Sequence, residues 1–154
     1  MIINVMSEDI AEDASYKLED LTAIISVRNM DDDCVPFCES KSLYAVKTLF
    51  FDDTDQETPN CFSPEKAEEI REFLQSVLGH VDRLIVHCEN GISRSAGIAA
   101  AILKTLTGDD TPITGDHWFV PNKLCYSLTM QALNDAEGKS LIGNTECEFR
   151  DNIL

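Results

Sequence analysis

Apolar runs alternate with polar stretches along the first third of the chain. Three of these runs, apolar or enriched in β-branched residues, predict strands at Met1–Met6, Thr22–Val27 and Leu43–Phe51. Between the first two, the acidic, alanine-containing segment Ser7–Leu18 predicts a helix that Ser7 caps. The turn-forming segment Asn29–Cys38 predicts a loop. Strand and helix therefore alternate from the start.

The next helix has a clear beginning. Ser63 is placed to cap it, and Pro64 suits its first position. Apolar residues then recur at helical spacing and predict one buried face made of Ala67, Ile70, Phe73, Leu74 and Val77.

The apolar run Leu84–His87 is typical of a central parallel strand. The small and apolar segment Ser95–Leu106 predicts a buried helix, and Asn122–Asn134 predicts a last one. Gly108–Gly115 reads as a loop, and the tail, which contains Gly138 and Gly143, is weakly patterned. The order of elements predicts an α/β fold, a mostly parallel central sheet with helices on both faces.

Composition and charge narrow the function. The chain has 154 residues and no linker or repeat, so one domain over residues 1–154 is expected. No apolar run approaches the roughly 20 residues that a membrane span needs. A net charge of −16 repels nucleic acid and anionic lipid, so we expect no nucleic-acid or membrane partner.

Six cysteines without a basic leader sequence favour reduced thiols and a cytoplasmic protein. Cys34 and Cys38 lack a second Cys/His pair at zinc spacing, so no metal site is expected.

The chemistry is concentrated in the segment from Val86 to Gly97. Five residues separate Cys88 from Arg94, a loop long enough to wrap backbone N–H groups around a phosphate. Gly91 allows the positive φ that such a loop needs, and the planar guanidinium of Arg94 can hold two phosphate oxygens. These donors and the following helix N-terminus also stabilise a Cys88 thiolate, which is a nucleophile. A buried cysteine beside an ordinary turn is the alternative structural interpretation.

This segment resembles the cysteine-based protein tyrosine phosphatases, specifically the dual-specificity type. The family pattern of His-Cys, five residues, Arg, then Ser or Thr is matched by His87, Cys88, Gly91, Arg94 and Ser95. The resemblance implies that His87 supports the thiolate and that Ser95 donates a hydrogen bond to the leaving sulfur. A purely structural histidine is the alternative for His87. Simple helix capping is the alternative for Ser95, and the two roles of this serine can coexist. The backbone donors of the loop would come chiefly from Glu89, Asn90, Ile92 and Ser93.

The resemblance also implies a carboxylic acid upstream that protonates the leaving oxygen. Asp52, Asp53 and Asp55 follow the strand Leu43–Phe51. We rank Asp53 first because Asp53-Thr54 follows the strand as the family's acid does, Asp55 second and Asp52 third. A solvated turn is the alternative interpretation of these aspartates.

The sequence thus predicts a phosphatase that needs no metal or cofactor and works through a phosphocysteine. The expected substrate is phosphotyrosine in a protein or peptide, with phosphoserine and phosphothreonine open as further substrates. The loop has no basic side chain between its cysteine and arginine, which by the resemblance disfavours inositol lipids and RNA ends. Two other hypotheses remain: an inactive phosphate-binding scaffold, and a cysteine-loop sulfurtransferase or arsenate reductase.

Overall fold

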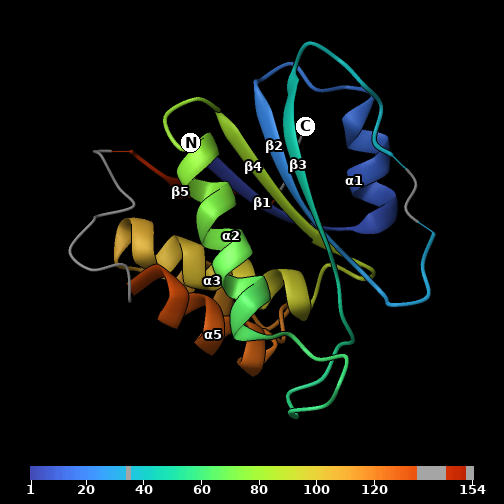
Figure 1. Cartoon of the computed structure of the whole chain (residues 1–154). Coiled ribbons are helices and arrows are strands. Elements are labelled where there is room, and N and C mark those ends of the chain that lie inside the picture. Colours follow the sequence, from blue (N-terminus) through green and yellow to red (C-terminus); the bar gives the residue numbers. More distant parts are fainter. Residues whose placement is uncertain (34–35, 135–144, 152–154) are drawn as a thin grey trace.

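The computed structural model describes residues 1–33, 36–134 and 145–151, and its centre is one all-parallel sheet (Figure 1). Five strands lie in the order β3-β2-β4-β1-β5. Their bounds are Ile2–Ser7 (β1), Thr22–Arg28 (β2), Leu43–Phe50 (β3), Arg83–Cys88 (β4) and Glu148–Phe149 (β5). The predicted α/β class is confirmed.

Helices cover both faces of this sheet (Figure 1). They are α1 (Glu8–Ser15), α2 (Pro64–Val77), α3 (Arg94–Thr107), α4 (Thr111–Thr114) and α5 (Lys123–Asn134). The main core lies between the sheet and α2, α3 and α5, and a smaller one lies under α1. Successive residues of β4 alternate between them, since Leu84 and Val86 join the main core and Ile85 joins the smaller one.

The predicted helix starts are confirmed. The Ser7 hydroxyl accepts a hydrogen bond from the Ile10 N–H, and Ser63 accepts one from Lys66. On α2 the predicted face is buried at Ala67, Ile70, Leu74 and Val77, with Phe73 only partly buried.

Three sequence predictions differ from the structure. The first helix ends at Ser15, three residues before Leu18, where the Ser15 hydroxyl donates to the Glu12 carbonyl. The predicted loop Gly108–Gly115 contains the one-turn helix α4, stabilised by hydrogen bonds from Ile113 and Thr114 to the Asp110 carbonyl.

The weakly patterned tail also supplies β5. The Glu148 N–H donates to the Met1 carbonyl, and Arg150 donates to Ile3. The rest of that predicted segment, residues 135–144 with Gly138 and Gly143, and Cys34 of the predicted Asn29–Cys38 loop lie outside the described residues.

Among the described residues, no helix is long and apolar enough to cross a bilayer. The five described cysteines are free thiols at Cys38, Cys61, Cys88, Cys125 and Cys147.

Candidate active site

A pocket of about 240 Å³ opens where the neighbouring parallel strands end. Cys88 is the last residue of β4, and Asn29 directly follows β2. The residues around the pocket are Asn29, Asp53, Cys88, Glu89, Asn90, Ile92, Ser93 and Arg94. The carboxyl edge of a parallel sheet is the usual place for a ligand, because loops from several strands converge there.

The loop between Cys88 and Arg94 is tightly shaped. Gly91 has φ +69°, which an L side chain rarely adopts, and a Cβ there would lie 2.5 Å from the Met6 carbonyl carbon. The end of β1 therefore forms a wall behind the loop.

Hydrogen bonds fasten both sides of this loop. Its Glu89 carbonyl accepts from the Glu8 N–H at 3.2 Å, and its Ile92 and Ser93 carbonyls accept from Val120 at 3.0 Å and Asn122 at 2.9 Å. Two separate segments of the chain, the start of α1 and residues 120–122, thus preorganise the loop.

The Cys88 sulfur lies at the floor of the pocket, where the residue is 3% exposed. Its nearest polar partner is the buried Ser95 hydroxyl, with Sγ and Oγ 3.0 Å apart. Ser95 is the second residue of α3, and Ser93 occupies the cap position without a side-chain capping hydrogen bond. Ser95 is therefore not the capping residue of α3, and its hydroxyl is placed to donate to a thiolate.

Arg94 is the pocket's cation, and it is almost fully buried. One terminal nitrogen donates to the Phe51 carbonyl at 2.7 Å and the other donates to Asn29 Oδ1 at 2.8 Å. The Nε atom is buried and has no hydrogen-bond partner among the residues that the structure describes. A buried guanidinium donor without a partner costs stability.

The three candidate aspartates have different environments. Asp53 lines the pocket, and its Oδ1 accepts hydrogen bonds from Ser93 Oγ at 2.8 Å and Asn122 Nδ2 at 2.9 Å. Asp55 Oδ1 accepts instead from the Lys123 N–H at 2.8 Å, at the first residue of α5. Asp52 is exposed and is not among the pocket residues. Of the three aspartates, Asp53 is the one that lines the pocket with Cys88 and Arg94.

His87 lies on the opposite face of β4 from the main core. It is fully buried, its Nε2 is 2.7 Å from Ser26 Oγ, and its Nδ1 is 3.5 Å from the Cys88 carbonyl oxygen. Burial, with smaller effects of the Arg28 and Arg94 charges, lowers the pKa of His87 to about 4. The His87 imidazole is therefore neutral at neutral pH and brings no positive charge to the Cys88 sulfur. It contacts the start of the loop through the main-chain carbonyl of Cys88.

Sequence reasoning missed three residues of this network. Asn29 accepts a hydrogen bond from Arg94 and donates one to Glu89 Oε2 at 3.2 Å. The Ser26 hydroxyl forms a hydrogen bond with the His87 ring. Asn122 donates to the Asp53 carboxylate. Asn29 follows a strand end, which is the signal that could have marked it. Two loop residues do more than provide backbone, since Glu89 and Ser93 both make side-chain hydrogen bonds.

Comparison with known proteins supports the fold. No protein-family model and no curated protein matches the sequence. Among solved structures, the chain is similar to the human tyrosine phosphatase-like serine/threonine/tyrosine-interacting protein, with 17% identity and a TM-score of 0.55. The similarity covers 82% of this chain and 83% of that one. The chain therefore has a tyrosine phosphatase-like fold.

Proposed function

We propose that this protein is a cysteine-dependent phosphatase that hydrolyses phosphotyrosine in proteins or peptides, and phosphoserine or phosphothreonine as well. One observation carries the proposal: the Cys88 sulfur, the Arg94 guanidinium and the Asp53 carboxylate line the same pocket. A nucleophile, an anion-binding cation and an acid are the groups that phosphate transfer to a cysteine needs. The reaction needs no metal ion or organic cofactor.

In the first step the Cys88 thiolate attacks phosphorus while the bond from phosphorus to the leaving oxygen breaks. The backbone N–H groups of residues 89–93 and Arg94 bind the remaining phosphate oxygens. Asp53 gives its proton to the leaving oxygen. The hydrogen bonds that Asp53 accepts from the described residues fall on Oδ1, so Oδ2 is the oxygen that carries the transferred proton.

In the second step water attacks the phosphocysteine, and Asp53 accepts the proton that the water loses. The bond from phosphorus to sulfur breaks, and the thiolate returns. Ser95 lies 3.0 Å from the sulfur and donates a hydrogen bond to the charge that forms there. A thiolate enzyme of this kind works in a reducing compartment, so we propose the cytoplasm as its location.

The experiment is hydrolysis of p-nitrophenyl phosphate in the presence of a metal chelator, with orthovanadate as inhibitor. We expect turnover by the wild type, no turnover by Cys88→Ser with phosphate or tungstate binding retained, and loss of both in Arg94→Ala. Cys125→Ser is the matched control, because Cys125 is also a buried thiol but is absent from the pocket lining. Turnover by Cys88→Ser above background refutes the proposal.

The same assays, repeated with thiosulfate and with arsenate as substrates, separate the alternatives. Tungstate binding without turnover in the wild type indicates a phosphate-binding scaffold. Turnover of thiosulfate or arsenate in place of the ester indicates sulfur transfer or arsenate reduction.

A further inference from the structure

A second, larger pocket of about 460 Å³ adjoins the phosphate site. Asn90 borders both pockets, and Gly91 also lines the second one. The two pockets are therefore neighbours on either side of Asn90, and an extended ligand could occupy both.

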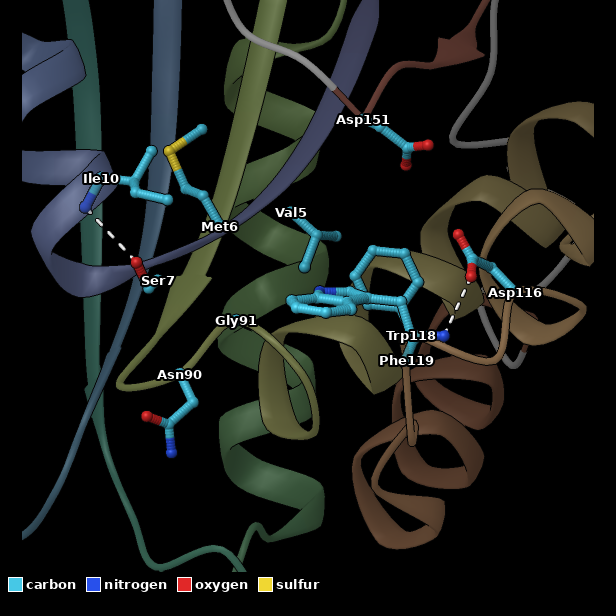
Figure 2. Close-up of a pocket in the computed structure, with 10 residues that line it drawn as sticks. All are labelled: Val5, Met6, Ser7, Ile10, Asn90, Gly91, Asp116, Trp118, Phe119 and Asp151. Carbon is cyan, nitrogen blue, oxygen red and sulfur yellow. Dashed lines mark hydrogen bonds between the residues drawn. The ribbon is translucent and has the colours of Figure 1, made fainter.

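The walls of this pocket are largely apolar. Val5, Met6 and Ile10 come from β1 and α1, and Trp118 and Phe119 come from the segment before α5 (Figure 2). Trp118 is 69% exposed, which is unusual for so large an apolar side chain. Its backbone is nevertheless held, because the Trp118 N–H donates to Asp116 Oδ1 at 2.9 Å. The indole is an exposed aromatic surface on a supported backbone.

Two carboxylates complete the lining. In the view of Figure 2, Asp116 and Asp151 lie toward one end of the pocket and Asn90 toward the other. The neighbouring cation Arg150 bonds to Glu148, and no lysine or arginine is among the pocket residues. The pocket is thus apolar along its walls and negative at one end, in a protein of net charge −16.

We infer that this pocket binds a lysine or arginine side chain of the phosphorylated segment, close in sequence to the phosphoresidue. The inference rests on the proposed function and names its substrate class: phosphopeptides with a basic flanking residue. Lysine and arginine combine an aliphatic stem with a cationic head, so the stem can contact Val5 and Phe119 while the head reaches the carboxylates. The Trp118 ring adds a surface for a cation–π contact.

Other side chains fit this lining less well. An acidic residue would meet Asp116 and Asp151 with like charge, and a purely apolar one would cover those carboxylates without pairing them. His117 is fully exposed, and its Nδ1 lies 4.0 Å from Asp116 Oδ1.

The test compares three phosphotyrosine peptides that differ at one flanking position, which carries arginine, norleucine or glutamate. The comparison is repeated with this variable residue at each nearby position on either side of the phosphotyrosine. Affinity is measured with Cys88→Ser, so that the result does not depend on turnover. Trp118 is the single tryptophan of the chain, and its fluorescence reports directly on the pocket. At the best position we expect arginine to bind about three- to tenfold more tightly than norleucine, as cation–π and exposed ion pairs typically give. Glutamate should bind the weakest.

Asp116→Asn with Asp151→Asn should reduce the arginine preference toward one, while turnover of p-nitrophenyl phosphate in the Cys88-containing background stays unchanged. The control Glu72→Gln removes an exposed carboxylate from α2 and should keep the preference. Equal affinity for the three peptides, tighter binding of norleucine, or an arginine preference that survives the double substitution overturns the inference. If one of these results is found while the wild type still hydrolyses p-nitrophenyl phosphate, the inference about the pocket fails and the proposed phosphatase activity stands. If binding depends on arginine but the wild type shows no turnover, the proposed activity fails and the inference about the pocket stands.

Discussion

The sharpest structural prediction concerns Gly91→Ala, because three glycines within residues 1–33, 36–134 and 145–151 share a positive φ and differ in their surroundings. Gly79 has φ +83° and Gly108 has φ +80°, and a Cβ at either would meet nothing within 4 Å. At Gly91, with φ +69°, the Cβ would lie 2.5 Å from Met6 C and 2.6 Å from Ser7 N, both backbone atoms. Conformational strain is common to all three substitutions, and the steric clash belongs to Gly91 alone.

The two effects have separable magnitudes. A left-handed conformation costs an L-residue roughly 1–2 kcal/mol, which is the whole loss expected for Gly79→Ala and Gly108→Ala. Overpacking against backbone adds about 1–3 kcal/mol, so Gly91→Ala should lose roughly 2–5 kcal/mol in total. The entropy that alanine removes from the unfolded chain is similar in each variant and cancels in the comparison.

Urea unfolding of the three variants measures these losses. Tungstate binding by the folded protein checks the second consequence: Gly91→Ala should weaken it, because the loop and the end of β1 must separate, whereas the controls should bind normally. If Gly91→Ala is no less stable than the two controls and binds tungstate equally well, the close approach of the loop to β1 is wrong.

Three further predictions concern the site's titratable groups. Asp53→Asn should lower turnover of tyrosyl phosphate about 100-fold and remove the basic limb of its pH profile, with a smaller loss of rate on a substrate with a good leaving group. Asp55→Asn should keep both the rate and the basic limb. The reverse result would assign the role of the acid to Asp55. Because the pKa of His87 falls from 6.5 to about 4 on folding, the unfolded chain binds the extra proton between these values, and stability should drop by about 3 kcal/mol as pH falls through that window. His87→Gln should lack this part of the acid sensitivity in urea unfolding, and an unchanged pH dependence would contradict the assignment. Iodoacetate below neutral pH should label Cys88 faster than the other thiols, and phosphate should protect it, whereas equal labelling would argue against a stabilised thiolate.

The sequence predicted the elements whose residues carry their own local signal. The apolar run before Cys88 and the capping pair Ser63-Pro64 identify β4 and the start of α2 without any tertiary information. By contrast, β5 has two residues and exists because the exposed edge of β1 supplies hydrogen bonds. Such an element depends on a partner distant in sequence, which no local pattern reports.

The residues of the site also fall into those that a local sequence pattern predicts and those that depend on distant parts of the chain. The loop residues are contiguous, so their spacing alone predicts a phosphate cradle. Asn29 and Asn122 reach the site only because the fold brings a strand end and a helix start beside that loop. Their side chains are ordinary in a loop and at a helix terminus, and only hydrogen bonds spanning more than sixty residues give them a role.

The central claim is that phosphate passes through the Cys88 sulfur. Rapid acid quenching of the wild type during turnover of a phosphotyrosine peptide, followed by peptide mass spectrometry, tests it directly. The account predicts a phosphoryl group on the peptide that contains Cys88, absent when orthovanadate is present and absent in Cys88→Ser. Steady turnover with no phosphoryl group on Cys88 at any quench time would contradict the account.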